Sequence, residues 1–210
     1  MAGAIDWPGW GRSGRDEKSA LQALVDYGPR YARVLHNAGL AFQPPADTSV
    51  LVVIERLQGN ATTDFGAPAI ILAADRESID QTEFERLRRL LLAGWQAFDS
   101  AAQQATGKAL RKGPRGGGRD LTKILRHILE ADQEYLRRLG WKRKGEEAKN
   151  LGEELELTRR AILNALEAAV KGQLPEQGPR GGIIWPPRYF IRRAAWHALD
   201  HAWEIEDRVV

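Results

Sequence analysis

The strongest pattern in the sequence is the return of apolar side chains every three or four residues through the second half of the chain. This spacing places apolar residues on one face of an α-helix. Four segments show it: Asp80 to Thr106, Asp120 to Leu139, Glu146 to Val170 and Pro187 to Arg208. Asp120 suits the position that caps the amino end of a helix, and Pro187 suits a first helical turn. The pattern therefore predicts four amphipathic helices.

Four amphipathic helices of similar length predict a four-helix bundle over residues 76–210. The fold class is predicted to be mainly α, with the helices in up-down-up-down order. In that order the second and fourth helices run in the same direction. At about 1.5 Å per residue, His127 lies roughly 10 Å from the start of the second helix and His197 roughly 15 Å from the start of the fourth. These two side chains are therefore expected to meet.

Residues 1–75 carry a shorter and more mixed pattern, which predicts a small α/β region. A helix is predicted from Asp16 to Ala38, with a kink or a break at Gly28 and Pro29. The β-branched run from Ser49 to Arg56 favours a strand, and Gly3 to Asp6 favours a short one. The chain is therefore predicted to consist of this region and the bundle that follows it.

The composition of the chain excludes several kinds of chemistry. The 210 residues include no cysteine, which excludes disulfides, thiolate catalysis and cysteine-bound metal. With 31 Lys+Arg against 28 Asp+Glu the net charge is +3, and such a mixed surface gives little support to nucleic-acid binding. The sequence has no long apolar run and no signal peptide at its start, so no membrane contact is expected and a cytoplasmic location is predicted.

The histidines carry the most specific chemistry in the sequence. His197 and His201 are four residues apart, so both rings lie on one face of the predicted fourth helix. With His127 from the second helix they predict a three-histidine site for a divalent metal, Zn²⁺, Ni²⁺ or Fe²⁺, with open positions for water or substrate. The alternative is that the pair only hydrogen-bonds or titrates at the surface, with His127 at the boundary of the core. His36, in the N-terminal region, is predicted to be an ordinary surface or boundary residue.

Two carboxylates accompany the histidine pair. Asp200 lies between the two histidines in sequence, and Glu204 follows His201 by three residues. Either is predicted to orient an imidazole or to act as a general base. The alternative is that both are solvated carboxylates paired with Arg193 or Arg208.

The sequence GPRGG occurs twice, at residues 113–117 and 178–182, each time before a segment that contains histidine. In the predicted topology both loops lie at the same end of the bundle. Helix amino ends favour anions, and arginine adds a two-pronged donor. Arg115 and Arg180 are therefore predicted to bind an anionic group of a substrate or co-substrate. The alternative is that both loops are plain turns with surface arginines.

Two stretches of the chain resemble a known family. The run from His127 to Tyr135 and the closing run from Trp196 to Arg208 resemble the DinB-like superfamily, over about residues 78–210. The resemblance implies a four-helix bundle that binds a divalent metal through one histidine of its second helix and an H-x-x-x-H pair of its fourth. All three ligand positions are matched here, by His127, His197 and His201. Some relatives are thiol-dependent transferases or isomerases that act with mycothiol or bacillithiol, and many have no assigned reaction.

The site and the resemblance together favour a metal-dependent hydrolase or thiol-dependent transferase. Its expected substrate is small and anionic or thiol-linked, with a low-molecular-weight thiol as co-substrate. Separately, the segment from Asp6 to Trp10 resembles the start of the HicB-like antitoxin fold. The alternative to an enzyme is a non-catalytic metal-binding protein, or a regulatory stress-response protein whose N-terminal part is an interaction module. A homodimer is compatible with a bundle of this kind, although the sequence does not require one.

Overall fold

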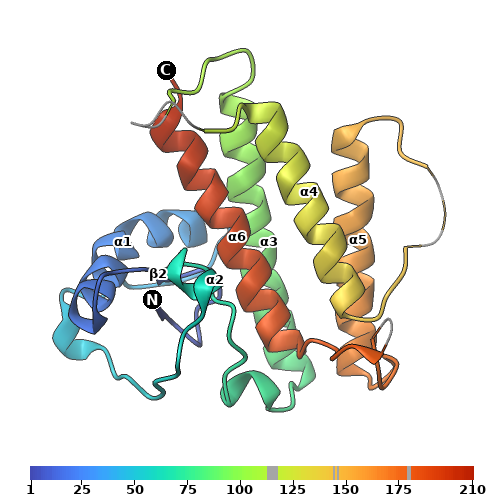
Figure 1. The fold of residues 1–210 in the computed structure, drawn as a ribbon, viewed down its shortest axis with the longest axis horizontal. Helices are drawn as coiled ribbons and strands as arrows, with labels where there is room; N and C mark the ends of the chain where they lie inside the picture. The colour runs from blue at the N-terminus through green and yellow to red at the C-terminus, as the bar shows by residue number, and fades with distance from the viewer. Residues whose placement is uncertain (113–117, 144, 146, 179–180) are drawn as a thin grey trace.

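A computed structural model describes residues 1–112, 118–143, 145, 147–178 and 181–210. The described part is mainly helical, with a two-stranded antiparallel sheet near the amino terminus (Figure 1). Its elements are β1 (Ala2–Gly3), β2 (Gly11–Arg12), α1 (Glu17–Asn37), η1 (Thr48–Val50), α2 (Ala61–Asp64), η2 (Ala74–Arg76), α3 (Gln81–Gln104), α4 (Leu121–Arg138), α5 (Leu151–Val170) and α6 (Pro187–Arg208). None of the described helices combines the length and the apolar character that crossing a bilayer requires.

The four predicted long helices are confirmed as α3 to α6, and their ends follow from local capping. Asp120 caps α4 by accepting a hydrogen bond of 2.8 Å from the Lys123 amide, as predicted. Pro187 occupies the first turn of α6. The start of α5 is later than predicted, because Asn150 caps it by accepting a hydrogen bond of 3.0 Å from the Glu153 amide.

The directions of the helices differ from the predicted up-down-up-down order. Helices α3 and α6 run the same way: Arg188 in the first turn of α6 pairs with Glu83 in the first turn of α3. At the other end, the Arg111 amide donates 2.7 Å to the Arg208 carbonyl. Figure 1 shows these two helices side by side, and they form the largest helix contact in the described part.

Helix α4 runs against α6. The Trp185 amide, just before α6, donates 2.9 Å to the carbonyl of Arg138 at the end of α4. Arg208, at the end of α6, donates 2.8 Å to the carbonyl of Arg119, just before α4. The predicted parallel direction of these two helices is therefore wrong.

Helix α5 runs in the same direction as α4 (Figure 1). The 18 residues of α4 span about 27 Å at 1.5 Å per residue. Extended chain covers about 3.3 Å per residue, so the segment 139–150 is long enough to return to the other end of α4 before α5 begins. The predicted order assumed a short connection at this point.

The antiparallel packing of α4 and α6 also separates the described residues that flank the two GPRGG stretches. Gly118, which follows the first stretch, packs against the guanidinium of Arg208 at the end of α6. Gly182, the last residue of the second stretch, comes just before the start of α6. The described flanks therefore lie at opposite ends of α6, not at one end. Arg115 and Arg180 themselves lie outside the described residues.

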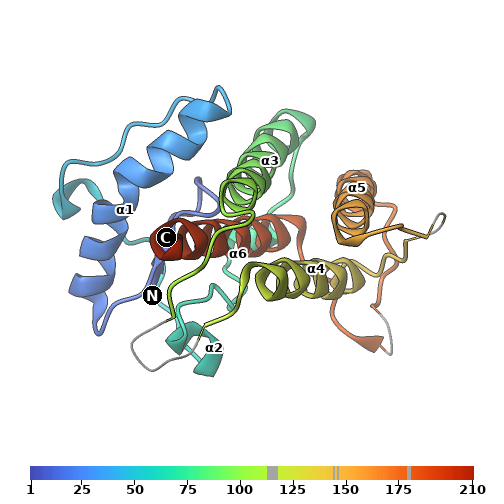
Figure 2. The same cartoon turned by 90° about the horizontal axis from the view of Figure 1, so that it is seen from above.

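One hydrophobic core joins the long helices to the N-terminal region. Each of the four long helices contributes fully buried side chains, such as Phe98, Ile124, Ile162 and Phe190. Helix α1 adds Leu24, Tyr31 and Leu35 to the same cluster, and Trp10 lies beside them, its indole N–H donating 2.8 Å to the Leu24 carbonyl. Figure 2 shows α1 and α5 on opposite sides of the molecule with α3 and α6 between them. The division at residue 75 stays a prediction.

The predicted elements of the N-terminal region are only partly observed. Helix α1 forms as predicted but continues through Pro29 without a break. The predicted strand from Ser49 to Arg56 is absent: Thr48–Val50 is a 3₁₀ turn, and the following residues have no regular structure. Its side chains Val52 and Ile54 are 83% and 68% exposed, because the only described sheet pairs β1 with β2 and offers this segment no partner strand.

Candidate metal centre

The three predicted histidines meet between α4 and α6. His127 lies about two turns from the start of α4, and His201 lies about two turns from the end of α6. Because these two ends are adjacent in the antiparallel pair, the histidines face each other. The predicted convergence is therefore confirmed, although the helices run in opposite directions.

The geometry of the cluster suits a single ion. One nitrogen from each of His127, His197 and His201 lies within 4.8 Å of the others. The Nε2 atoms of His127 and His197 are 3.2 Å apart. Two nitrogens at the 2.0–2.1 Å Zn–N distance in a tetrahedral site are separated by about 3.3 Å. The spacing of these two Nε2 atoms therefore matches that of two ligands of one cation.

Burial favours the neutral forms of His197 and His127. His197 and His201 are 7% and 8% exposed, and His127 is half-buried. Burial holds the pKa of His197 well below its usual value, and the neighbouring His201 and His127 lower it further. Burial, followed by His201, also lowers the pKa of His127. A neutral imidazole keeps the lone pair that a metal needs.

Glu204 is the carboxylate that contacts the cluster. Its Oε2 lies 2.7 Å from Nδ1 of His201, and its other oxygen binds Arg208. The hydrogen bond with His201 is the main reason why the pKa of Glu204 is lowered. With Nδ1 held in this way, His201 has Nε2 free to bind a metal, which is the usual arrangement of a metal-binding histidine. The predicted orienting contact and the alternative pairing with Arg208 are thus both present.

Asp200 points elsewhere. It pairs with Arg12 at 3.0 Å, and its side chain is 43% exposed. The guanidinium of Arg12 stacks over the rings of Tyr27 and Trp203 at 3.8 and 4.1 Å. The described contacts of Asp200 therefore give no support to its predicted role as a general base, since the carboxylate binds Arg12 of the N-terminal region.

Two further polar side chains, Tyr135 and Arg193, lie beside the cluster and were not predicted as site residues. The ring of Tyr135 lies 5.9 Å from that of His197, and its hydroxyl accepts a hydrogen bond of 3.2 Å from Nε of Arg193. Tyr135 follows His127 by eight residues and Arg193 precedes His197 by four, so each shares a helix face with a histidine. That spacing was the available signal.

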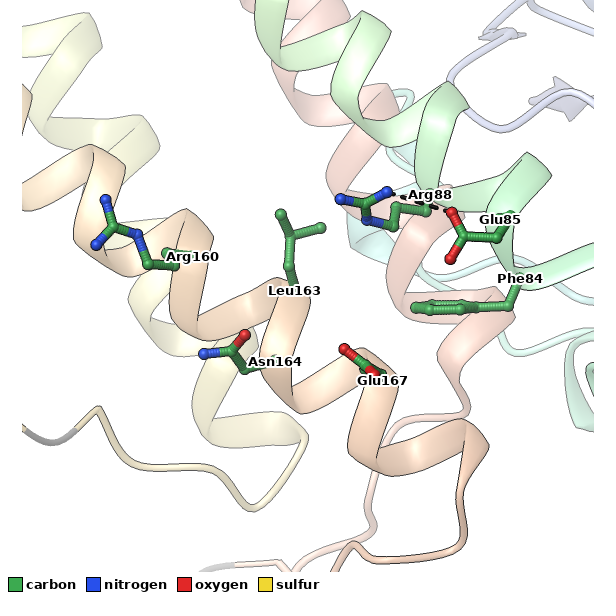
Figure 3. A pocket seen from close by; sticks show the side chains of 7 residues that line it. All are labelled: Phe84, Glu85, Arg88, Arg160, Leu163, Asn164 and Glu167. Atoms are coloured by element: carbon green, nitrogen blue, oxygen red, sulfur yellow. Dashed lines mark hydrogen bonds and ion pairs between the residues drawn. The ribbon is translucent and has the colours of Figure 1, made fainter. Parts of the chain in front are cut away.

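A surface pocket lies away from this centre. Figure 3 shows it between Phe84 of α3 and Leu163 of α5, with a volume of about 390 Å³. Glu85 and Arg88 form an ion pair at its rim. None of its lining residues belongs to the histidine cluster. We place the candidate chemistry at the histidines, because this pocket contains charged surface side chains but no group of potential ligands.

A comparison with known proteins found no protein-family model, no curated protein and no solved structure that matches this chain.

Proposed function

We propose that His127, His197 and His201 bind one divalent metal ion and that the protein is a metal-dependent enzyme. The observation that carries the proposal is the approach of three largely buried imidazole nitrogens to within 4.8 Å of one another. We further propose that α3 to α6 form a bundle of the DinB-like kind, as the resemblance of the two histidine-containing runs implies. An all-imidazole ligand set suits Zn²⁺, Ni²⁺ or Fe²⁺.

The proposed chemistry is hydrolysis or the transfer of a group to a low-molecular-weight thiol. A bound ion would polarise water or a thiolate at the positions that three protein ligands leave open. His127, His197 and His201 hold the ion, and Glu204 fixes the ring of His201. Turnover of metal-loaded protein with thiols and electrophiles separates an enzyme from a protein that only binds metal.

Metal content tests the ligand set. The native chain is expected to retain about one divalent ion per chain after dialysis, as a single three-histidine site requires. His127→Ala and His201→Ala are expected to retain almost none, because each loses one of three ligands. His36→Ala is the matched control, since His36 is exposed at the end of α1. Native metal content in His127→Ala, measured by mass spectrometry, would contradict the proposal.

Two amide substitutions distinguish the roles of Glu204 and Asp200 in metal binding. Glu204→Gln is expected to weaken metal binding about 10- to 100-fold, the usual effect of losing a carboxylate behind a metal-binding histidine. Asp200→Asn makes the same chemical change one turn away, at a carboxylate that pairs with Arg12. Its metal affinity is expected to match the native value. Competition with a chromophoric chelator measures both, and equal affinities in the two variants would remove Glu204 from the site.

A further inference from the structure

A half-buried guanidinium usually has a carboxylate partner, but Arg193 has none in the described part of the chain. Its Nε donates 3.2 Å to the Tyr135 hydroxyl. Its Nη1 is buried and has no hydrogen-bond partner. Among the described residues, no carboxylate lies within ion-pair distance of it. Arg193 therefore carries its charge in a partly dehydrated position without a described counter-charge.

Three other buried or half-buried arginines among the described residues are paired. Arg12 contacts Asp200 at 3.0 Å, and Arg159 contacts Asp99 at 2.8 Å. On α6 itself, Arg192 next in sequence binds the buried Asp75. Burying a charge is costly unless it is paired, so the protein supplies a carboxylate in each of these cases. The missing acid beside Arg193 therefore indicates that its partner is a ligand.

Arg193 lies beside the histidine centre. It precedes His197 by four residues, so the two side chains share one face of α6, one turn apart. Tyr135 links the two, because its ring lies 5.9 Å from that of His197 while its hydroxyl accepts from Arg193. No described residue accepts the hydroxyl hydrogen of Tyr135. A phenol and a guanidinium with unused donors thus lie one helical turn from the proposed metal.

We propose that Arg193 and Tyr135 form an oxyanion subsite, which binds a carboxylate or phosphate group of the substrate beside the metal centre. Guanidinium binds such groups through two parallel charge-assisted hydrogen bonds, and the phenol supplies one more donor. At the other end of the cluster, Glu204 already pairs with Arg208. The inference rests on the proposed function, which places the reacting group of the substrate at the metal. The subsite adds a binding position for an oxyanion at the other end of the same molecule.

The subsite defines a substrate class. A molecule held in this way has two ends: a group that reaches the metal and an oxyanion one helical turn away. A small dicarboxylate has this arrangement, whereas a monocarboxylate can occupy only one of the two positions. Succinate, acetate and inorganic phosphate are therefore suitable probes.

The test is a titration of Co²⁺-loaded protein, followed by visible absorption, with the three probes and with acetamide as the neutral control. Native protein is expected to bind succinate more tightly than acetate. Arg193→Met is expected to bind succinate at least about ten-fold more weakly, and Tyr135→Phe several-fold more weakly, with unchanged cobalt content. Arg193→Lys keeps the positive charge but loses the two-pronged guanidinium. Its succinate affinity is expected to lie between those of the native protein and Arg193→Met. Inorganic phosphate shows whether the subsite takes a tetrahedral oxyanion as well.

Arg126→Met is the matched control, because it removes an exposed arginine from the helix that carries His127. Equal succinate affinity in native and Arg193→Met protein overturns the subsite, and so does an equal loss in Arg126→Met. Tryptophan fluorescence of metal-free protein gives a second measurement, since Trp196 lies 5.4 Å from the Arg193 guanidinium. If native protein takes up no cobalt but the metal-free chain still binds succinate through Arg193, the metal proposal fails while the subsite stands.

Discussion

Replacing Asp75 with alanine is expected to lower the free energy of unfolding by about 3–5 kcal/mol, the usual cost of leaving a buried charge without its partner. Asp75 and Arg192 are 3% and 8% exposed, and the carboxylate binds the guanidinium through both of its oxygens. Asp75 also accepts 2.8 Å from the Leu72 amide. In the variant, the Ile70 carbonyl, at 2.8 Å, is the one hydrogen-bond acceptor of Arg192 that remains among the described residues.

Urea unfolding of native and Asp75→Ala protein measures this difference. Glu167→Ala is the control, because it removes a carboxylate from an exposed pair with Lys171 and is expected to change stability by less than about 0.5 kcal/mol. The double variant Asp75→Ala, Arg192→Met is expected to recover part of the loss, since it removes the unpaired charge. If the double variant is no more stable than Asp75→Ala, the loss comes from packing and not from the charge.

The pair also matters for the proposed site. Asp75 belongs to η2, and Arg192 precedes Arg193 on α6, so the ion pair attaches the segment before α3 to the helix that carries two of the histidines. Because Asp75 binds Arg192, this carboxylate is not available to neutralise Arg193. The contrast between these two neighbouring arginines, one paired and one open, cannot be seen in the sequence, where both look like surface residues of a helix.

The long helices were predictable because their signals are local. Apolar spacing, the cap at Asp120 and the proline at residue 187 all act within a few residues. The direction of α5 is not local, because the segment 139–150 is long enough to join α4 to either end of α5. Tertiary contacts decide between the two, and no pattern within one helix records them. The strand predicted from Ser49 to Arg56 failed for a related reason, since β propensity forms no sheet without a partner strand.

The site shows the same division between local and tertiary information. The spacing of His197 and His201 fixes their common face whatever the topology. His127 meets them because it lies about two turns from the start of α4, and His201 lies about two turns from the adjacent end of α6. The cluster was therefore predicted correctly although the relative direction of the two helices was not. Asp200 was expected to serve the histidines, but Arg12 engages it from a residue far away in sequence. Only the folded chain reveals that contact.

A second large effect is expected from Asp132, a carboxylate buried among α3, α4 and α5. It is 2% exposed, and burial raises its pKa to about 7, although Arg159 lies 3.8 Å away and opposes the shift. Arg159 cannot compensate fully, because its Nη1 binds both oxygens of Asp99 at 2.8 Å. Oδ2 of Asp132 has no hydrogen-bond partner. The fold therefore favours the neutral acid.

The raised pKa determines how stability depends on pH. Between the unfolded pKa of 3.8 and the folded value of about 7, the native state holds a proton that the unfolded state has lost. The contribution of Asp132 is therefore fully present below pH 4 and disappears as the pH rises to about 7. At 1.36 kcal/mol per pKa unit, the total loss is on the order of 4 kcal/mol.

Asp132→Asn is accordingly expected to be more stable than the native chain above pH 7, by up to about 4 kcal/mol, and to lose this advantage near pH 4. Urea unfolding at intervals from pH 4.5 to 8.5 gives the difference directly, because the other titrating groups are common to both proteins. Asp132→Ala also removes the charge but leaves a small void, so its curve is expected to run parallel to that of Asp132→Asn at lower stability. A difference between native and Asp132→Asn that stays constant with pH would mean that the carboxyl group titrates normally, and that Arg159 offsets the cost of burial.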